Sequence, residues 1–288
     1  MVYPRIPGHE VVGTVHGIGP HVSARWRLGQ RVGVGWHAGR CENSEACDAC
    51  RRGEFFVCPK ATGTGLTVDG GLAEYMLADQ TALVAIPEDI PSTQAAGLLC
   101  AGLTVFNAIR LSNIRPGDTI AVAGIGGLGH LALQFGKKFG YRVVAISSSP
   151  HKRQDCLEQF GAHIFIDSSA ENVPALLAEL RPTLILGTSV DAKSITELTP
   201  SYPSNAQLVI LSEPPTRDGT LSIPYLPLLF NRNSVAGFTA GTAVEAEHAL
   251  RVAQLVGITV QVEEYPLEAA EEAFATIKNA RYRRVVVM

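Results

Sequence analysis

The pattern of hydrophobic positions changes near Pro91. Before it, apolar residues form short β-type runs between glycines, such as Glu10–Val15 and Gln30–Val34. After it, apolar strands alternate with longer helical patterns. The predicted strands are Thr119–Ala123, Arg142–Ile146, His163–Ile166, Thr183–Leu186 and Gln207–Leu211. The predicted helices between them include Leu128–Phe139, His151–Phe160 and Val173–Leu180. This alternation predicts right-handed βαβ units and a parallel sheet.

A second helical region follows Gly237. The pattern there predicts a helix over Ala243–Val256, a strand over Thr259–Val262, a helix over Leu267–Lys278 and a last strand over Arg284–Val287. We find no internal repeat, low-complexity tract or long linker. A chain of 288 residues is long enough for about two domains.

Composition and charge narrow the class of protein. The chain has 46% hydrophobic and 18% charged residues, which is typical of a globular protein and unlike a disordered one. Its net charge of −3 offers no basic surface for nucleic acid or an anionic membrane. Apolar runs such as Ile120–Leu128 are shorter than the ~20 residues of a membrane span. The first residues do not resemble a signal peptide. We expect a soluble, cytoplasmic protein.

A glycine-rich loop follows the first strand of the parallel sheet. Gly124, Gly126 and Gly129 form a G-x-G-x-x-G pattern between a predicted strand and a predicted helix. Gly124 would permit the turn, Gly126 the close approach of a pyrophosphate, and Gly129 close packing of helix on strand. The alternative is a structural turn that holds no ligand. The predicted cofactor-binding residues here are Gly124, Ile125, Gly126, Gly127, Leu128 and Gly129.

The end of the second strand bears on which cofactor binds. An NAD site usually has Asp or Glu there for the ribose hydroxyls, about 20 residues beyond the loop. This chain has Ser147, Ser148 and Ser149, followed by Lys152 and Arg153. Hydroxyls and cations suit a 2′-phosphate, and a carboxylate would repel it. We therefore expect NADP(H), held by Ser147, Ser148, Ser149 and Lys152. The alternative is that the two cations are merely a solvated helix start.

Four of the six cysteines lie within 18 residues of one another. Cys41, Cys47, Cys50 and Cys58 have the spacing C-x5-C-x2-C-x7-C. Clustered thiolates in a chain without secretion features indicate a structural zinc site. A reduced, metal-free or disulfide-bonded loop is the alternative. His9 and Glu10 lie far along the chain from Cys100. On spacing alone, an isolated histidine or cysteine is more often structural than a ligand.

Several motifs together resemble one family, the zinc-dependent medium-chain alcohol dehydrogenases, and most closely its NADP-preferring branch that includes cinnamyl alcohol dehydrogenases. The resemblance runs from Tyr3 to Met288. Besides the cysteine loop and the glycine loop, the motifs that carry it are Pro-Gly-His-Glu-Val-Val-Gly at 7–13, Gly-Val-Gly-Trp-His at 33–37, Asp-Gly-Gly-Leu-Ala-Glu-Tyr at 69–75, Leu-Leu-Cys-Ala-Gly-Leu-Thr-Val-Phe at 98–106, Ser-Ser-Ser-Pro-His-Lys at 147–152 and Val-Ala-Gly-Phe-Thr-Ala-Gly-Thr at 235–242.

The resemblance implies an α/β protein of two domains. A GroES-like catalytic domain would cover residues 1–97, a Rossmann domain 98–239, and a return to the catalytic domain 240–288. It implies that His9 and Cys100 are ligands of a catalytic zinc, with Glu10 as a nearby or alternating ligand. Thr104 would lie near the nicotinamide, and Gly237, Phe238 and Thr239 would line the other side of the cofactor. The implied activity is NADP(H)-dependent interconversion of alcohols and aldehydes or ketones, with zinc as the Lewis acid.

Two departures from the family pattern open alternatives. The chain starts a few dozen residues into the family pattern, so it lacks a further cysteine ligand and the first strands of the barrel. We therefore keep open a truncated relative that has lost the catalytic zinc, and either only binds NADP(H) or a small molecule or runs a redox-neutral reaction. A late assigned start is a third possibility. The uncovered sheet edge would favour a homo-oligomer, most simply a dimer.

The second departure concerns the cysteine loop. The family's loop usually reads C-x2-C-x2-C-x7-C, and Ser44 stands where the first cysteine is expected. Either a small insertion lets Cys41 reach the metal, or this loop binds zinc poorly.

Overall fold

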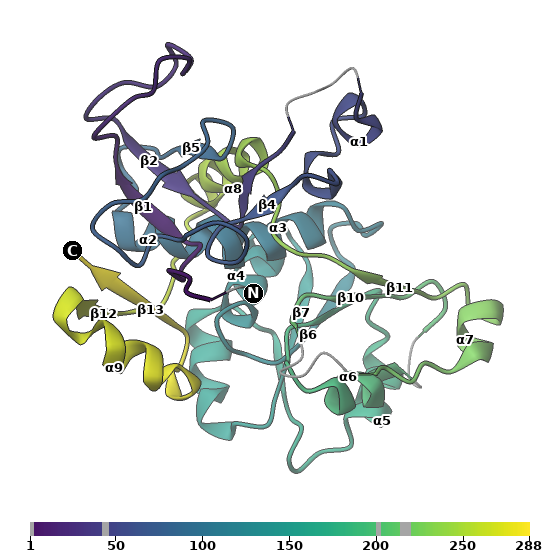
Figure 1. Cartoon of the computed structure of the whole chain (residues 1–288). Coiled ribbons are helices and arrows are strands. Elements are labelled where there is room, and N and C mark those ends of the chain that lie inside the picture. The colour runs from purple at the N-terminus through teal and green to yellow at the C-terminus, as the bar shows by residue number, and fades with distance from the viewer. Residues whose placement is uncertain (1–2, 42–45, 200–202, 214–219) are drawn as a thin grey trace. The chain divides into compact units, whose positions relative to one another are not determined.

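The chain divides into two compact units. The computed structural model describes residues 3–41, 46–199, 203–213 and 220–288 (Figure 1). One unit comprises Met1–Leu103 with Ala240–Met288, and the other comprises Thr104–Thr239. The first boundary therefore lies after residue 103 and not after residue 97, and the last segment groups with the N-terminal unit. We call these the N-terminal unit and the Rossmann unit.

A six-stranded parallel sheet forms the centre of the Rossmann unit (Figure 1). Its order is β11-β10-β9-β6-β7-β8. When the six strands are numbered 1 to 6 along the chain from β6, the order read from β8 to β11 is 3-2-1-4-5-6. This is the doubly wound dinucleotide-binding topology, so the predicted fold class is confirmed. The strands are β6 (Thr119–Ala123), β7 (Arg142–Ser147), β8 (Ile164–Asp167), β9 (Leu184–Gly187), β10 (Gln207–Ile210) and β11 (Ser234–Gly237).

Helices cover the sheet because its central strands are apolar along their length. All four residues of β9 are buried, as are five of the six in β7, which is typical of a sheet covered on both faces. Helix α4 packs against β6 and β7. The helices of this unit are α3 (Leu103–Arg110), α4 (Gly129–Lys138), α5 (Val173–Leu180), α6 (Ala192–Leu198) and α7 (Tyr225–Phe230).

Two helical predictions in this unit differ from the structure. The predicted helix His151–Phe160 is helical without a break over residues 150–159, but its turns are irregular: a 3-10 turn η3 (Pro150–Lys152) leads through residues 153–154 into a π-helical turn η4 (Asp155–Gln159). Apolar periodicity does not distinguish these turns from a regular helix. Helix α6 was not predicted, although Asp191 caps it by accepting hydrogen bonds from the backbone N–H groups of Lys193 (3.2 Å) and Ser194 (3.1 Å).

The N-terminal unit is built from small sheets. An antiparallel sheet has the order β1-β2-β5, and β3 pairs with β4. Strands β12 and β13 form a parallel pair. The strands are β1 (Val11–Thr14), β2 (Arg31–Val34), β3 (His37–Gly39), β4 (Thr62–Gly63), β5 (Leu83–Ala85), β12 (Val262–Pro266) and β13 (Arg283–Val287). The helical elements are α1 (Asp48–Arg51), η1 (Phe55–Val57), α2 (Ser92–Gly97), η2 (Leu98–Gly102) and α8 (Ala243–Val256).

The C-terminal predictions were only partly right. Helix α8 has the predicted bounds, because Thr242 and Glu245 form a capping box and Gly257 ends the helix with φ +72°. The strand predicted over Thr259–Val262 instead runs over Val262–Pro266, where it pairs with β13. The predicted helix Leu267–Lys278 is three pieces, η6 (Leu267–Ala269), α9 (Ala270–Ala275) and η7 (Ile277–Asn279).

The helical run Ser92–Arg110 is long and apolar enough to cross a membrane by length and composition alone. It contradicts the expectation that no such run exists. In the folded chain 78% of its apolar window is buried. This burial matches the core helix of a folded domain.

Candidate functional site

The glycine loop has the geometry that its sequence predicts. Gly124 has φ +97°, and a side chain there would meet the Ser189 nitrogen at 2.8 Å. A Cβ atom at Gly129 would lie 2.0 Å from the Gly124 carbonyl oxygen. The fold itself therefore requires both glycines. A Cβ at Gly126 would meet nothing within 4 Å. The glycine at 126 is thus not needed for packing, and the space beside it fits a phosphate group.

The loop leads directly into helix α4. No side chain caps the start of this helix, and the positive end of its dipole favours a nearby anion. His130 lies in its first turn, with Nδ1 3.0 Å from the Gly126 carbonyl oxygen. Burial lowers the pKa of His130 to about 4. The imidazole is therefore neutral at pH 7, and Nδ1–H donates to the loop.

The loop lies at the point where the strand order of the sheet reverses. Strand β6 pairs with β7 on one side and β9 on the other. The Thr188 hydroxyl, just after β9, donates hydrogen bonds to the carbonyl oxygens of Ala123 (3.2 Å) and Gly124. Ligands of doubly wound sheets bind at this carboxyl-end crevice.

Residues 147–153, at the end of β7 and just after it, include three hydroxyls and two cations and no carboxylate. The Ser147 hydroxyl accepts a hydrogen bond from the Ser149 N–H (3.2 Å), and Ser148 is exposed. Lys152 Nζ donates to the Ile125 carbonyl oxygen at 2.6 Å, so its charge lies on the glycine loop. Arg153 instead lies over the ring of Phe165. The two cations therefore differ in place and in role.

The remaining predicted cofactor residues differ in exposure. Gly237 ends β11 and is exposed, as is Thr239. The Phe238 N–H donates to the Ile210 carbonyl oxygen at 3.0 Å, which continues the sheet. Thr104 is buried at the start of α3. Gly237 and Thr239 are accessible to a ligand, whereas Thr104 is enclosed by protein.

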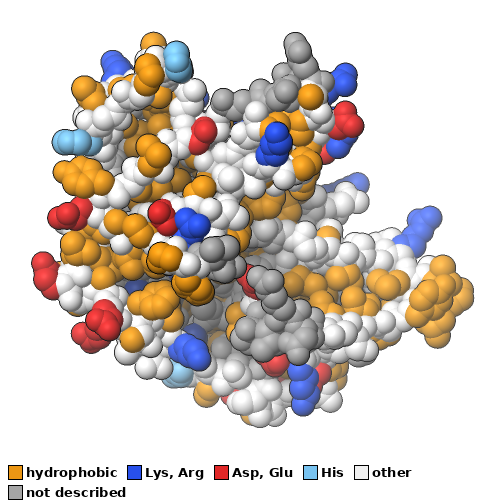
Figure 2. Space-filling view, viewed as in Figure 1, with side chains coloured by type: hydrophobic (Ala, Val, Ile, Leu, Met, Phe, Trp, Pro, Cys, Tyr) orange, Lys and Arg blue, Asp and Glu red, His pale blue; other side chains and the backbone are white. Residues whose placement is uncertain are grey.

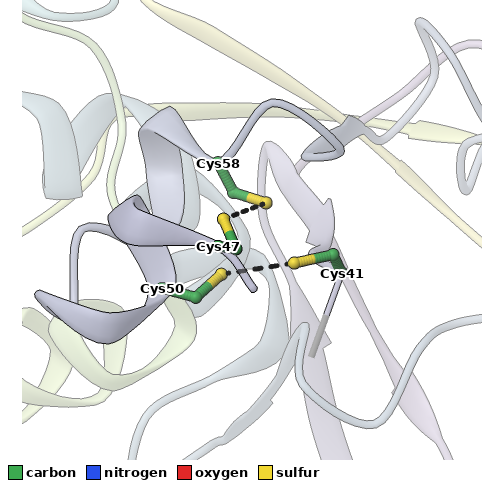
Figure 3. Close-up of side chains that lie close together, drawn as sticks. All are labelled: Cys41, Cys47, Cys50 and Cys58. Atoms are coloured by element: carbon green, nitrogen blue, oxygen red, sulfur yellow. Dashed lines mark hydrogen bonds between the residues drawn. The ribbon is translucent and has the colours of Figure 1, made fainter. Parts of the chain in front are cut away.

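The four clustered cysteines meet at one point (Figure 3). Their sulfur atoms all lie within 4.8 Å of one another. Cys41 and Cys50 are 3.6 Å apart, and Cys47 and Cys58 are 3.8 Å apart. Tetrahedral zinc with Zn–S bonds of about 2.3 Å separates its sulfurs by about 3.8 Å. Cys41 therefore reaches the cluster despite its wider spacing along the chain.

The electrostatics of the cysteine cluster also suit a cation. Backbone N–H groups of Cys41 and Lys60 lower the pKa of Cys58 to about 6. Burial and the neighbouring thiols raise the pKa of Cys50 to about 12. Without a positive ion the cluster holds few thiolates, because each negative charge opposes the next. Four thiolates together require a metal ion.

His9 and Glu10 lie in a polar cluster before β1. The ring of His9 meets Trp36 edge-on, with centroids 5.1 Å apart. Burial, and then the charge of Arg283, lower the pKa of His9 to about 4, so its imidazole is neutral and fit to bind a metal. Glu10 forms an ion pair with Arg283 and accepts a hydrogen bond from the Ala101 N–H at 2.9 Å.

The structure brings Glu10 to the segment that carries Cys100, but it does not gather the predicted catalytic ligands around one point. Glu10 contacts the backbone of Ala101, the residue after Cys100. Over the described residues, however, the cysteine cluster is the only group of three or more donor residues close enough to share an ion. His9, Glu10 and Cys100 do not form such a group.

Sequence reasoning missed Arg283. Its side chain is 24% exposed and holds Glu10. The signal was weak: Arg283 comes directly before the strand predicted over Arg284–Val287, and charged residues at a strand start are usually solvated. Nothing in the linear pattern pairs it with a carboxylate more than 270 residues away.

Comparison with known proteins places the chain in a family. The family model of the alcohol dehydrogenase GroES-like domain matches residues 1–88, and that of the zinc-binding dehydrogenase matches residues 127–255. The alcohol dehydrogenase notN of Aspergillus sp. (strain MF297-2) is 40% identical over 99% of this chain and 83% of its own length. A probable cinnamyl alcohol dehydrogenase 8A of Oryza sativa subsp. japonica is 34% identical over 99% of this chain and 80% of its own.

A solved structure agrees with these relatives. The cinnamyl alcohol dehydrogenase SbCAD4 of Sorghum bicolor has a TM-score of 0.85 and 31% identity, over 99% of this chain and 82% of that one. The GroES-like part, the parallel sheet order and these relatives agree. The chain belongs to the zinc-dependent medium-chain alcohol dehydrogenases, is similar to their cinnamyl-alcohol-dehydrogenase-like members, and is an alcohol dehydrogenase-like oxidoreductase.

Proposed function

We propose that this alcohol dehydrogenase uses NADP(H) to interconvert alcohols with aldehydes or ketones, with zinc as the Lewis acid. The observation that carries the cofactor choice is the bond from Lys152 to the Ile125 carbonyl oxygen. It holds a positive charge at the glycine loop, beside a strand end without a carboxylate. A 2′-phosphate is attracted by such a charge, and an NAD site would have an acid there.

The residues of the glycine loop have separate parts in binding the cofactor. Gly126 leaves room for the pyrophosphate, and the positive dipole at the start of α4 favours its negative charge. Ser147, Ser148 and Ser149 offer hydroxyls and N–H groups to the 2′-phosphate. Gly237, Phe238 and Thr239 would line the opposite side of the dinucleotide, and Thr104 would support the nicotinamide from within α3.

We assign a structural zinc to the cysteine cluster of Cys41, Cys47, Cys50 and Cys58. The sulfur separations of 3.6 and 3.8 Å support this assignment. The cluster connects α1 and η1 to the segment after β3. The bound metal would hold together the segment from Cys41 to Cys58, which has few regular helices or strands.

His9 and Cys100 would hold the catalytic zinc, with Glu10 as a nearby or alternating ligand. When bound, zinc supplies Lewis acidity to the substrate oxygen, and NADPH supplies the hydride. The neutral imidazole of His9 supports its role as a ligand. For Glu10 to bind the metal it would have to leave Arg283 and the Ala101 N–H. Arg283 therefore biases Glu10 away from the metal.

We also propose that the chain associates with a second copy of itself. Helix α7 exposes a group of large apolar side chains, and Figure 2 shows hydrophobic side chains gathered over it. Tyr225 and Phe230 are 71% and 76% exposed. Helix α7 precedes β11, an edge strand of the parallel sheet. An apolar helix beside a free strand edge favours self-association.

Light scattering at micromolar concentration tests this association. Leu226→Glu on α7 should shift the protein toward monomer. Leu255→Glu, on an exposed position of α8, is the control and should leave the assembly unchanged. A wild-type protein that is already monomeric would contradict the proposal.

An anomalous-scattering map at the zinc edge, from crystals grown with zinc and NADPH, tests the metal assignments. Peaks at the cysteine cluster and beside His9 support both zinc sites. Cys100→Ala should then abolish aldehyde turnover, while Cys156→Ala, remote in sequence and buried in η4, should keep it. Clear NADPH binding with no peak beside His9 and no turnover over a broad aldehyde panel would instead support the relative that has lost hydride chemistry.

A further inference from the structure

A glycine-rich loop crosses directly over the segment that carries His9 and Glu10. Three backbone hydrogen bonds join them. The Gly70 N–H donates to the Ile6 carbonyl oxygen (2.8 Å), the Leu72 N–H to that of Pro7 (3.1 Å), and the Gly71 N–H to that of Gly8 (3.1 Å). Every carbonyl oxygen of residues 6–8 therefore accepts from this loop. We call the residues Asp69–Leu72 the clamp.

The approach is so close that side chains are excluded from the clamp. A Cβ atom at Gly70 would lie 2.2 Å from the Gly8 carbonyl oxygen and 2.5 Å from that of Pro7. A Cβ at Gly71 would lie 2.3 Å from Cγ2 of Val11. Real Cβ contacts are longer than 3 Å. The two glycines thus contact the chain on both sides of His9 and Glu10, at residue 8 before them and residue 11 after them.

Asp69 adds a side-chain contact at the start of the clamp. Its Oδ1 atom accepts hydrogen bonds from Arg5 Nη1 (2.8 Å) and from the Ile6 N–H (3.2 Å). The Arg5 side chain is largely buried and that of Asp69 is exposed. The carboxylate therefore anchors the polar groups of residues 5 and 6 at the point where the segment enters the clamp.

The residues between the two contact points make long-range contacts of their own. The His9 ring meets Trp36, and Glu10 is held by Arg283 and the Ala101 N–H. These contacts need the backbone of residues 8–11 to be in one position, because a shift of one residue would change the face on which His9 lies. The clamp fixes that position from outside.

We propose that the clamp positions His9 for metal binding by fixing the backbone of the segment that carries it, with Gly70 and Asp69 as positioning residues. The expected effect on zinc affinity rests on the proposed zinc site. The expected effect on the backbone of residues 6–12 rests only on the contacts of the clamp. Groups that orient metal ligands typically change metal affinity by about 10–100-fold when they are lost. Only a glycine at position 70 allows the backbone to approach the carbonyl oxygens of Pro7 and Gly8 this closely.

The experiment compares Gly70→Ala and Asp69→Ala with the wild type and with Gly17→Ala. Gly17 is an exposed glycine whose Cβ would meet nothing within 4 Å, so it is a matched control. Backbone hydrogen exchange is measured on protein with the cysteine cluster loaded and no further zinc added, for residues 6–12, for strands β2 and β5 and for the Rossmann unit. Zinc affinity is then measured by chelator competition on the full chain, with the cysteine cluster already loaded.

We expect Gly70→Ala to speed exchange in residues 6–12 and to weaken zinc binding beside His9 by about tenfold or more. Asp69→Ala keeps the close backbone approach and should give a smaller change of the same kind, which also serves if Gly70→Ala does not fold. Zinc binding at the cysteine cluster should be the same in both variants as in the wild type. Gly17→Ala should have wild-type hydrogen exchange and wild-type zinc affinity.

Two results would overturn the clamp. One is exchange and zinc affinity within twofold of the wild type in both variants. The other is exchange that rises equally throughout the N-terminal unit, because that would show general destabilisation. If the wild type binds no zinc beside His9, the proposed metal site is wrong. The exchange data still show whether the clamp orders the backbone of residues 6–12.

Discussion

Lys152 donates a hydrogen bond from Nζ to the carbonyl oxygen of Ile125 at 2.6 Å. The bond joins the residues after one strand of the parallel sheet to the loop after its neighbour. The bond holds the Lys152 ammonium group at the glycine loop, at the edge of the sheet where ligands of this topology bind. The contact therefore sets the place of the positive charge before any cofactor arrives.

We expect Lys152→Ala to weaken NADPH binding about tenfold or more and to change NADH binding little. In the proposed NADP(H) site the lost charge would attract the 2′-phosphate, which NADH lacks. Fluorescence titration with both cofactors measures the ratio. Arg153→Ala is the matched control, since Arg153 lies over Phe165 and should alter the ratio by less than about threefold. Equal losses for both cofactors in Lys152→Ala would contradict the assignment.

Substitutions at two glycines of the loop should separate folding from binding. Gly126→Ala adds a Cβ into open space, so the protein should melt near the wild-type temperature but bind the dinucleotide poorly. Gly129→Ala places a Cβ 2.0 Å from the Gly124 carbonyl oxygen and should destabilise the fold by about 2 kcal/mol or more. Thermal melts with and without NADPH check both. A Gly126→Ala protein that NADPH still stabilises fully would contradict the role of this glycine.

Removing one sulfur should empty the cysteine cluster. Cys47→Ser is expected to lower bound zinc by about one equivalent per chain and the melting temperature by about 5–10 °C, because metal binding contributes to folding. Elemental analysis and melting curves measure these changes. Cys156→Ala lies outside the cluster and should keep its zinc. Unchanged zinc in Cys47→Ser would show that the cluster is not the site.

Stability should fall in mild acid because of His130. Burial lowers its pKa to about 4, from 6.5 in the unfolded chain. Between these values the unfolded chain binds more protons, so the free energy of unfolding rises with pH and is lost as the pH falls from about 6.5 to 4. The full effect is roughly 3 kcal/mol. Urea unfolding from pH 7 to 4 should show a shallower slope in His130→Gln, and the wild-type slope in exposed His151→Gln.

Removing the partner of Glu10 should destabilise the N-terminal unit. Arg283→Leu leaves a largely buried carboxylate without its counter-ion, at a cost of about 2 kcal/mol after discounting for partial exposure. Denaturant unfolding measures this cost. Arg281→Leu is the control, because Arg281 is exposed and should change stability by less than about 0.5 kcal/mol. A stable Arg283→Leu protein would show that water replaces the ion pair.

The parallel sheet could be predicted because each strand is a nearly continuous apolar run between turn residues. Five strand positions, from Thr119–Ala123 to Gln207–Leu211, agree with the structure to within a residue or so. The C-terminal strand Val262–Pro266 was misplaced because its sequence, Val-Glu-Glu-Tyr-Pro, has few apolar residues. Pairing with β13 sets its bounds, and such pairing leaves no local signal.

The local geometry of the candidate site could be predicted where a motif is short, and could not be predicted where the contacting residues are distant in sequence. The glycine loop and the cysteine spacing each lie within a few turns of chain, so the sequence indicates their chemistry. The pairing of Glu10 with Arg283, and the crossing of Gly70 over Pro7 and Gly8, join distant segments. Only the folded backbone brings those residues together.

The wider spacing between Cys41 and Cys47 has an evolutionary consequence. Five residues separate these two sulfur ligands, where the family pattern has two. Closing a loop of five residues instead of two costs about 1 kcal/mol of chain entropy, against about 10–16 kcal/mol for binding a structural zinc. An insertion between Cys41 and Cys47 would therefore weaken the proposed zinc site without abolishing it. A search that requires the fixed spacing of two would overlook such a metal site, and a short peptide tag inserted there should be tolerated.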